Sequence, residues 1–185
     1  MVRNFGALLI SLLLSACGGV PNTYHNLRPE ITAHTERQGT PIAIRYTELP
    51  SYYDKEYLTY YDKTNRIIIN KSHHWIYPFE NNFRDVLRQK LSAKTGNSRI
   101  YTYPIGDNIR PEIIIDLQIR ELIADLSQQK FILIAQWQNN KNGNGKPENH
   151  QYQQLLPLTN TDPDSIVDAT AQAINLLAEA IAQSL

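Results

Sequence analysis

Two stretches of the chain, 112–124 and 130–138, alternate between apolar residues and mostly polar ones. The apolar residues of this alternation are Ile113, Ile115, Leu117, Ile119, Phe131, Leu133, Ala135 and Trp137. A period of two is typical of β-strands that bury one face. The short connection 125–129 favours an antiparallel pair, with one face buried along its length and the other partly apolar.

Shorter segments predict further strands before and after this pair. In the first of them, Ile42, Ile44 and Tyr46 share one face and Arg45 points away from it. The other candidates are 56–61 and 66–70, joined as a hairpin by the polar turn 62–65, and the single strands 98–103 and 151–158. The Asn- and Gly-rich segment 139–149 indicates a surface loop.

Two segments have apolar residues at the spacing of a helix. The first has Pro78 in its first turn, ends at Gly96-Asn97 and carries the stripe Phe79, Phe83, Val86, Leu87 and Leu91. The second begins with Asp162 as N-cap and Pro163 at the first position, and carries Val167, Thr170, Ile174, Leu177, Ile181 and Leu185. Each stripe must cover a sheet or another helix.

The order of these elements predicts an α+β fold, with a mixed, largely antiparallel sheet and two amphipathic helices packed on one face. We assign residues 41–185 to this single domain and 17–40 to a polar tether. Tyr24 and Leu27 leave open an alternative in which part of the tether docks on the domain as an N-terminal strand.

The N-terminal residues 1–16 have the layout of a secretory signal peptide, with Arg3, the apolar run 5–14 and small residues before Cys17. As a helix the apolar run covers about 15 Å, which is too short to cross a bilayer. Leu14-Ser15-Ala16-Cys17 resembles the lipobox of bacterial lipoproteins. That resemblance implies a mature chain that starts at Cys17 and carries a diacylglyceryl group and an N-linked acyl chain there. The alternative is a free thiol beside an ordinary cleavage site.

The lipid on Cys17 implies a membrane anchor, and Gly18 indicates which membrane holds it. By analogy with lipoprotein sorting, an Asp at position 18 would keep the protein in the inner membrane. We therefore expect the periplasmic face of the outer membrane.

Composition excludes several classes of function. Lysine plus arginine and aspartate plus glutamate number 18 each and form no blocks, which disfavours a nucleic-acid partner. Cys17 is the only cysteine, so once lipidated it leaves no disulfide, thiol nucleophile or cysteine metal site. The sequence has no nucleophile elbow around Ser165 or Ser184, no H-E-x-x-H motif and no glycine-rich phosphate loop. We expect no catalytic residues and no cofactor beyond the covalent lipid.

The candidate contact residues are aromatic. Tyr52, Tyr53 and Tyr57, with Tyr60 and Tyr61, form a tyrosine-rich hairpin that suits a protein interface or a headgroup layer, although strand packing explains it equally well. Trp75 is either a packing anchor before the first helix or a lipid contact.

Two polar groups have ordinary explanations. His73-His74 suggests a metal, but neighbours on an extended segment point to opposite sides, so we expect none. We interpret Glu112, Asp116 and Arg120, with Glu121 nearby, as a solvated strand face with internal ion pairs.

Several separated segments together resemble the PqiC-type ABC-transport auxiliary lipoproteins. They are Tyr24-His25-Asn26-Leu27, Leu49-Pro50-Ser51-Tyr52-Tyr53-Asp54, Trp75 with Pro78, and 87–91. Ile76-Tyr77 and His74 depart from the family pattern, which affects polar contacts at that turn rather than the fold. The resemblance implies a periplasmic lipoprotein that works with an MCE-domain protein and inner-membrane transport subunits to move lipids between membranes.

We therefore expect a non-enzymatic accessory lipoprotein of an intermembrane lipid transport system. The alternatives are a stand-alone lipid-binding lipoprotein, a cell-envelope assembly scaffold and, as a distant third class, a hydrolase. The apolar seam of the last helix also leaves a homo-oligomer open, although packing on its own sheet is the default.

Overall fold

The computed structural model describes residues 21–28, 39–76, 78–141 and 145–185. The predicted signal peptide and Cys17 lie outside these residues. The strands are β1 (Thr23–His25), β2 (Ile42–Glu48), β3 (Tyr57–Tyr61), β4 (Ile67–Trp75), β5 (Ile100–Thr102), β6 (Ile113–Asp125), β7 (Lys130–Lys141) and β8 (Glu148–Pro157). The helices are the 3-10 turn η2 (Ser51–Tyr53), α2 (Phe79–Thr95) and α3 (Pro163–Gln183). The predicted α+β class is confirmed.

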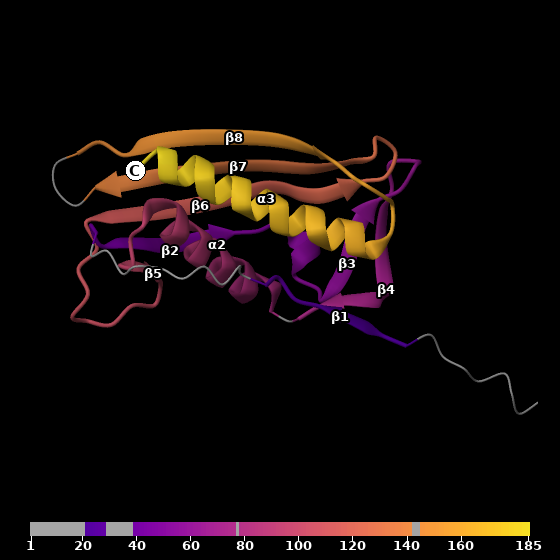
Figure 1. Cartoon of the computed structure of the whole chain (residues 1–185), viewed down its shortest axis with the longest axis horizontal. Coiled ribbons are helices and arrows are strands. Elements are labelled where there is room, and N and C mark those ends of the chain that lie inside the picture. Colours follow the sequence, from indigo (N-terminus) through magenta and orange to yellow (C-terminus); the bar gives the residue numbers. More distant parts are fainter. Residues whose placement is uncertain (1–20, 29–38, 77, 142–144) are drawn as a thin grey trace, which may run out of the picture.

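All eight strands belong to one mixed sheet, in which β6 is the central strand. One edge of β6 pairs with β7, which pairs in turn with β8, both antiparallel. The other edge is shared, because the first half of β6 pairs with β2 and its last residues pair with β3. Figure 1 shows this division, with β2 and β5 below one half of β6 and β3 and β4 below the other.

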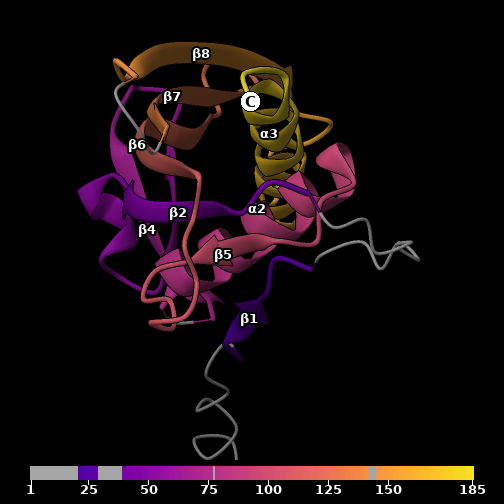
Figure 2. The same ribbon diagram turned by 90° about the vertical axis from the view of Figure 1, so that its left-hand side faces the viewer.

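Both helices lie on the same side of the curved sheet, as Figure 2 shows in the end view. The residues that α2 buries are the whole predicted stripe, and they join the inward residues of β6 and β7 in one core. In α3 the stripe residues Thr170, Ile174, Leu177 and Ile181 are buried, whereas Val167 and Leu185 are only partly buried and Ile166 is buried instead. The local signals for the helix ends are also confirmed. Asp162 accepts a hydrogen bond from the Ser165 backbone N–H, and Gly96 closes α2 in the left-handed conformation.

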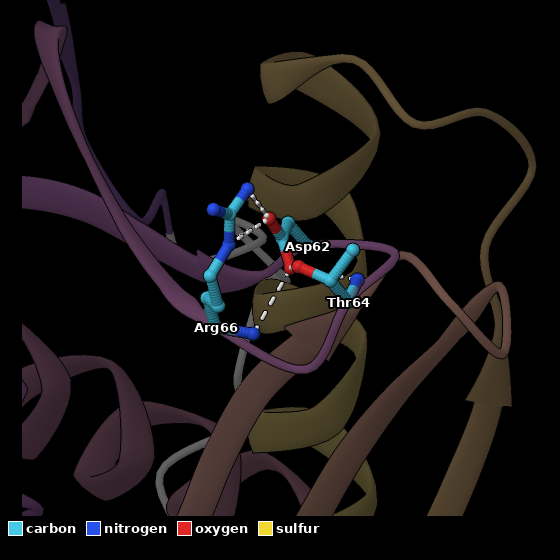
Figure 3. A network of polar contacts seen from close by, with 3 residues as sticks. All are labelled: Asp62, Thr64 and Arg66. Carbon is cyan, nitrogen blue, oxygen red and sulfur yellow. Dashed lines mark hydrogen bonds and ion pairs between the residues drawn. The ribbon is translucent and has the colours of Figure 1, made fainter.

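The long hairpins turn around aspartates. The carboxylate of Asp62 accepts hydrogen bonds from the Thr64 and Arg66 backbone N–H groups, from the Thr64 hydroxyl and from the Arg66 guanidinium, as Figure 3 shows. These contacts fix the predicted hairpin between β3 and β4, in which Asn65 takes a positive φ of 60°. Asp125 holds the turn from β6 to β7 in the same way, through Ser127 and Gln128.

Irregularities in three strands correct the predicted faces. A bulge between Ile44 and Tyr46 places Tyr46 opposite Asp116, on the outer face, where its side chain is 56 % exposed. The expectation that Tyr46 shares a face with Ile44 is therefore wrong, and Thr47 takes the inward position instead. A bulge at Arg120 likewise brings Glu121 to the outer face of β6, opposite Ile134.

The predicted strand 66–70 is longer than expected, because it continues through a third irregularity to Trp75. Pro78 caps α2 in extended conformation and does not lie within its first turn. The predicted loop 139–149 is also shorter, because β7 runs to Lys141 and β8 begins at Glu148.

The alternative of a docked N-terminal strand is what the structure has. Thr23, Tyr24 and His25 of β1 pair in parallel with His73, His74 and Trp75 of β4. Leu27 is buried in the core, and its backbone N–H donates to the Asn82 side chain of α2 at 3.0 Å. Strand pairing and burial together tie this segment to the domain.

Candidate functional site

Aromatic and histidine side chains gather where β1 joins the domain. This aromatic–histidine cluster consists of Tyr24, His25, Tyr53, Tyr57, His73, His74, Trp75 and Phe79. It includes three of the four predicted contact residues, and Tyr52 adjoins it through Tyr53, with ring centroids 5.1 Å apart. The predicted aromatic residues therefore lie together in space, although they come from separate segments.

The centre of the cluster is an aromatic stack inside the domain. Phe79 lies parallel to Tyr53, with ring centroids 4.1 Å apart, and contacts Trp75 at 4.9 Å. Trp75 is only 2 % exposed. The Tyr53 hydroxyl donates to the Leu122 carbonyl at 2.7 Å, and burial raises the pKa of Tyr53 well above its usual value. In this conformation the rings of Tyr53 and Trp75 pack against the domain, as they would if their role were structural.

Tyr52 and Tyr57 lie nearer the surface. The Tyr52 hydroxyl accepts a hydrogen bond from the Leu122 N–H at 3.1 Å and donates to the Glu121 carboxylate at 3.3 Å. Burial is the main reason why the pKa of Tyr52 is raised, and the negative charge of Glu121 adds to it. Tyr57 is partly exposed, and its ring lies 5.1 Å from that of His74.

The two adjacent histidines of β4 point to opposite sides, as expected for an extended segment. His73 Nδ1 lies 2.9 Å from His25 Nε2, in a hydrogen bond between β4 and β1. Burial lowers the pKa of His25, the nearby His73 lowers it further, and Asp164 opposes these effects. His25 is therefore held in its neutral form more firmly than a free imidazole would be.

His74 is enclosed between the rings of Tyr24 and Tyr57 and is 5 % exposed. Neither ring nitrogen has a hydrogen-bond partner, although Nδ1 lies 3.5 Å from a Glu56 carboxylate oxygen. Within the residues that the structure describes, no three His, Cys, Asp or Glu side chains come together in a way that could hold a metal ion.

A pocket of about 670 Å³ adjoins the cluster at the end of β2. We call it the β2 pocket; its wall includes Thr47, Leu49, Tyr53, Phe79 and Arg84, and its rim carries charged side chains. It opens where β5 ends, because β5 pairs with β2 only as far as Ile44 and no other described strand takes over that edge. The sequence analysis did not identify Thr47 or Arg84 as pocket residues. Nothing in the sequence marks the bulge that turns Thr47 inward, and Arg84 lies outside the apolar stripe of α2.

The acidic residues of β6 form ion pairs and hydrogen bonds on the outer face. Asp116 holds the Arg45 guanidinium through both carboxylate oxygens, at 3.0 and 2.6 Å, and also accepts from Asn140. Glu121 accepts from Tyr52. Both carboxylates are thus held in polar contacts on the outer face, as interpreted from the sequence.

A family model described as the ABC-type transport auxiliary lipoprotein component matches residues 25–182. The chain belongs to this family. The resemblance noted from Tyr24-His25-Asn26-Leu27 and the later segments is thus confirmed. The family description makes the protein an auxiliary component of an ABC-type transport system. None of the curated proteins compared with the chain matches it.

Two solved structures share the fold. A crystal structure of an uncharacterized protein has a TM-score of 0.71 at 14 % identity, over 89 % of this chain and 98 % of that one. A protein from Xanthomonas campestris, described with the family model DUF330, has a TM-score of 0.68 at 10 % identity, over 86 % of this chain and 92 % of that one. Identities this low show the fold alone. Among the described residues, no helix combines the length and the apolar character needed to span a membrane.

Proposed function

We propose that this family member is a lipoprotein on the periplasmic face of the outer membrane that assists an MCE-domain protein and inner-membrane transport subunits in moving lipids. The family match over residues 25–182 carries the proposal. In this role the protein is not an enzyme and needs no cofactor besides the lipid on Cys17. Its contribution is to bind and position partners.

The docking of β1 supports a defined orientation at the membrane. Between Cys17 and Thr23 an extended chain reaches at most about 20 Å, at 3.3–3.6 Å for each residue. A lipid on Cys17 would therefore hold the aromatic–histidine cluster near the bilayer surface, since β1 is part of that cluster. Tyr52, Tyr57 and the exposed Tyr24 and Ile76 would lie at the same end. Aromatic rings with polar tips suit the headgroup layer or a partner held there.

The anchor is tested by cell fractionation of Cys17→Ser and Gly18→Asp variants. We expect Cys17→Ser to lose membrane attachment and Gly18→Asp to keep its lipid but move to the inner membrane. The folded domain of each variant should unfold at the same temperature as that of the unaltered protein. If Cys17→Ser stays in the outer membrane, the lipid anchor is refuted.

The partners are tested by photo-crosslinking in cells from position 57, with position 155 as the control. Leu155 is 42 % exposed and lies on β8, away from the cluster. We expect Tyr57, but not Leu155, to give an adduct that mass spectrometry identifies as an MCE-domain protein, and the adduct should vanish when that protein is deleted. Co-purification of phospholipid without any transport subunit would instead indicate a stand-alone lipid-binding lipoprotein.

A further inference from the structure

Two residues that line the β2 pocket each carry a buried polar atom without a partner. Thr47 is 8 % exposed, and its hydroxyl has no hydrogen-bond partner among the described residues. The Nε–H of Arg84 is likewise buried and unpaired. Buried donors are almost always satisfied, so two exceptions in one pocket call for an acceptor that enters it.

The fold places both groups there by separate means. The bulge at Arg45 turns Thr47 toward the interior, opposite Leu117 of β6. Arg84 lies on α2, and one of its terminal nitrogens donates to the Tyr103 carbonyl, which fixes the direction of the guanidinium. Its other terminal nitrogen is 3.9 Å from Glu80, too far for a hydrogen bond. Arg84 thus offers a guanidinium of fixed direction, and Thr47 offers a hydroxyl that can turn its hydrogen toward a negatively charged oxygen.

The rim of the pocket has the opposite charge. Asp54 and Glu80 are exposed at the rim, and Glu48 lies beside them. Arg45 also lines the pocket, but both of its hydrogen bonds go to Asp116. A simple anion would meet these carboxylates on its way to Arg84, and a simple cation would leave the Arg84 and Thr47 donors unpaired. A zwitterion matches both parts of the pocket, with its anionic group at the inner donors and its cationic group at the acidic rim.

We propose that the β2 pocket binds a phosphoethanolamine group, with its phosphate at Thr47 and Arg84 and its ammonium facing Asp54 and Glu80. The apolar surface of Leu49, Tyr53 and Phe79 would hold the carbon atoms that follow. The volume of about 670 Å³ lies within the usual range for small-ligand sites. The inference rests on the proposed role in lipid transport, to which it adds the headgroup recognised, and the same chemistry is present in a free phosphoethanolamine ester.

The test is a calorimetric titration of the full-length lipoprotein in non-ionic detergent. The probes are the dihexanoyl forms of phosphatidylethanolamine, phosphatidylcholine and phosphatidylglycerol, with O-phosphoethanolamine as the soluble ester. We expect the ethanolamine lipid to bind at least about tenfold more tightly than the other two lipids, because choline has no N–H donors and glycerol has no charge for the rim. If O-phosphoethanolamine binds as tightly as the lipid, the soluble ester is the ligand; if it binds much more weakly, the lipid is.

Variants assign the binding to the pocket. Arg84→Gln should weaken it by about tenfold or more, because a charged hydrogen bond to phosphate is lost. Thr47→Val keeps the volume of the side chain and should weaken it severalfold. Arg88→Gln is the matched control, because Arg88 lies on the same helix and pairs with Asp85 but does not line the pocket. Its affinity should equal that of the unaltered protein.

The proposal is overturned if the three lipids bind alike, if no probe binds, or if both Arg84→Gln and Thr47→Val bind as tightly as Arg88→Gln. The proposed function can fail separately. Cross-linking to transport subunits without headgroup binding would refute only the pocket, whereas selective headgroup binding without any transport partner would refute only the accessory role.

Discussion

Replacing Thr47 with valine should stabilise the ligand-free protein. Valine is β-branched like threonine and also favours strands, so the packing of β2 is kept. The substitution removes a hydroxyl that is buried without a partner. From mutational data such a group costs about 1–3 kcal/mol. We therefore expect the free energy of unfolding to rise by about 1 kcal/mol, which corresponds to about 2–4 °C in the unfolding temperature for a domain of this size.

A second buried threonine provides the control. Thr170 on α3 is fully buried, but its hydroxyl donates to the Ile166 carbonyl at 2.8 Å. Thr170→Val removes a satisfied hydrogen bond and should lower the free energy of unfolding by about 0.5–1.5 kcal/mol. Urea unfolding of both variants, followed by circular dichroism, should show a higher free energy of unfolding for Thr47→Val and a lower one for Thr170→Val.

The reasoning is refuted if Thr47→Val destabilises the protein as much as Thr170→Val does. That result would mean that the Thr47 hydroxyl has a partner in the free protein. A gain in stability together with a loss of headgroup affinity is the pattern expected where a binding site keeps a polar group at the expense of stability.

Three further outcomes are expected. Burial and His73 lower the pKa of His25, so the undocked segment binds protons more readily and β1 docking should weaken as pH falls through 6.5. Amide exchange of residues 23–28 at about pH 7.5 and about pH 5.5 measures this effect, and His25→Gln should remove the pH dependence. Gly39→Ala would place a Cβ 2.5 Å from the Asn97 side chain, which is fixed by hydrogen bonds to Thr40 and Arg99. We expect a loss of about 1–2 kcal/mol in urea unfolding, whereas Gly106→Ala should cost less. Asn139→Ala removes hydrogen-bond donors to Ser184 and should release the last turn of α3, which would lower the free energy of unfolding by about 1–2 kcal/mol. Amide exchange should then become faster at residues 181–185 and stay unchanged in the first turn of α3.

The elements with regular periods were predictable because their signals are local. The alternation in 113–119 and the helical stripe from Phe79 to Leu91 each mark one apolar face. The folded protein buries that same face, so the pattern within each segment was sufficient to predict it. The ends of the helices were predictable for the same reason, since Asp162 and Gly96 act on their own neighbours.

Features that depend on distant partners were not predictable. Nothing near Arg45 or Arg120 distinguishes a bulge from a regular strand, so the face of Tyr46 was assigned incorrectly and the outward position of Glu121 was not predicted. The parallel pairing of the very short β1 with β4 likewise has no local signal.

The aromatic residues Tyr52, Tyr53, Tyr57 and Trp75 of the candidate site could be identified from the sequence. Their contact with His25 depends on the β1–β4 pairing, and the choice of Thr47 as a ligand-facing residue depends on the bulge. Both are products of the folded sheet.

One chain of contacts joins the docked strand to the β2 pocket. His25 of β1 lies against Trp75, Trp75 contacts Phe79, and Phe79 stacks on Tyr53. Phe79 and Tyr53 are also part of the pocket wall. A change that releases β1 should therefore loosen that wall as well, since packed aromatic rings have few alternative arrangements.

Acid provides such a change without any alteration of the ligand. A phosphatidylethanolamine headgroup keeps both of its charges between about pH 5.5 and about pH 7.5, because its phosphate ionises well below this range and its amine well above it. A fall in dihexanoyl phosphatidylethanolamine affinity over that interval would thus come from the protein, and the His25→Gln variant tests whether His25 is its source. We expect the fall in the unaltered lipoprotein and its absence in His25→Gln. Equal affinities at both pH values, with β1 released at the lower one, would show that the strand and the pocket are independent.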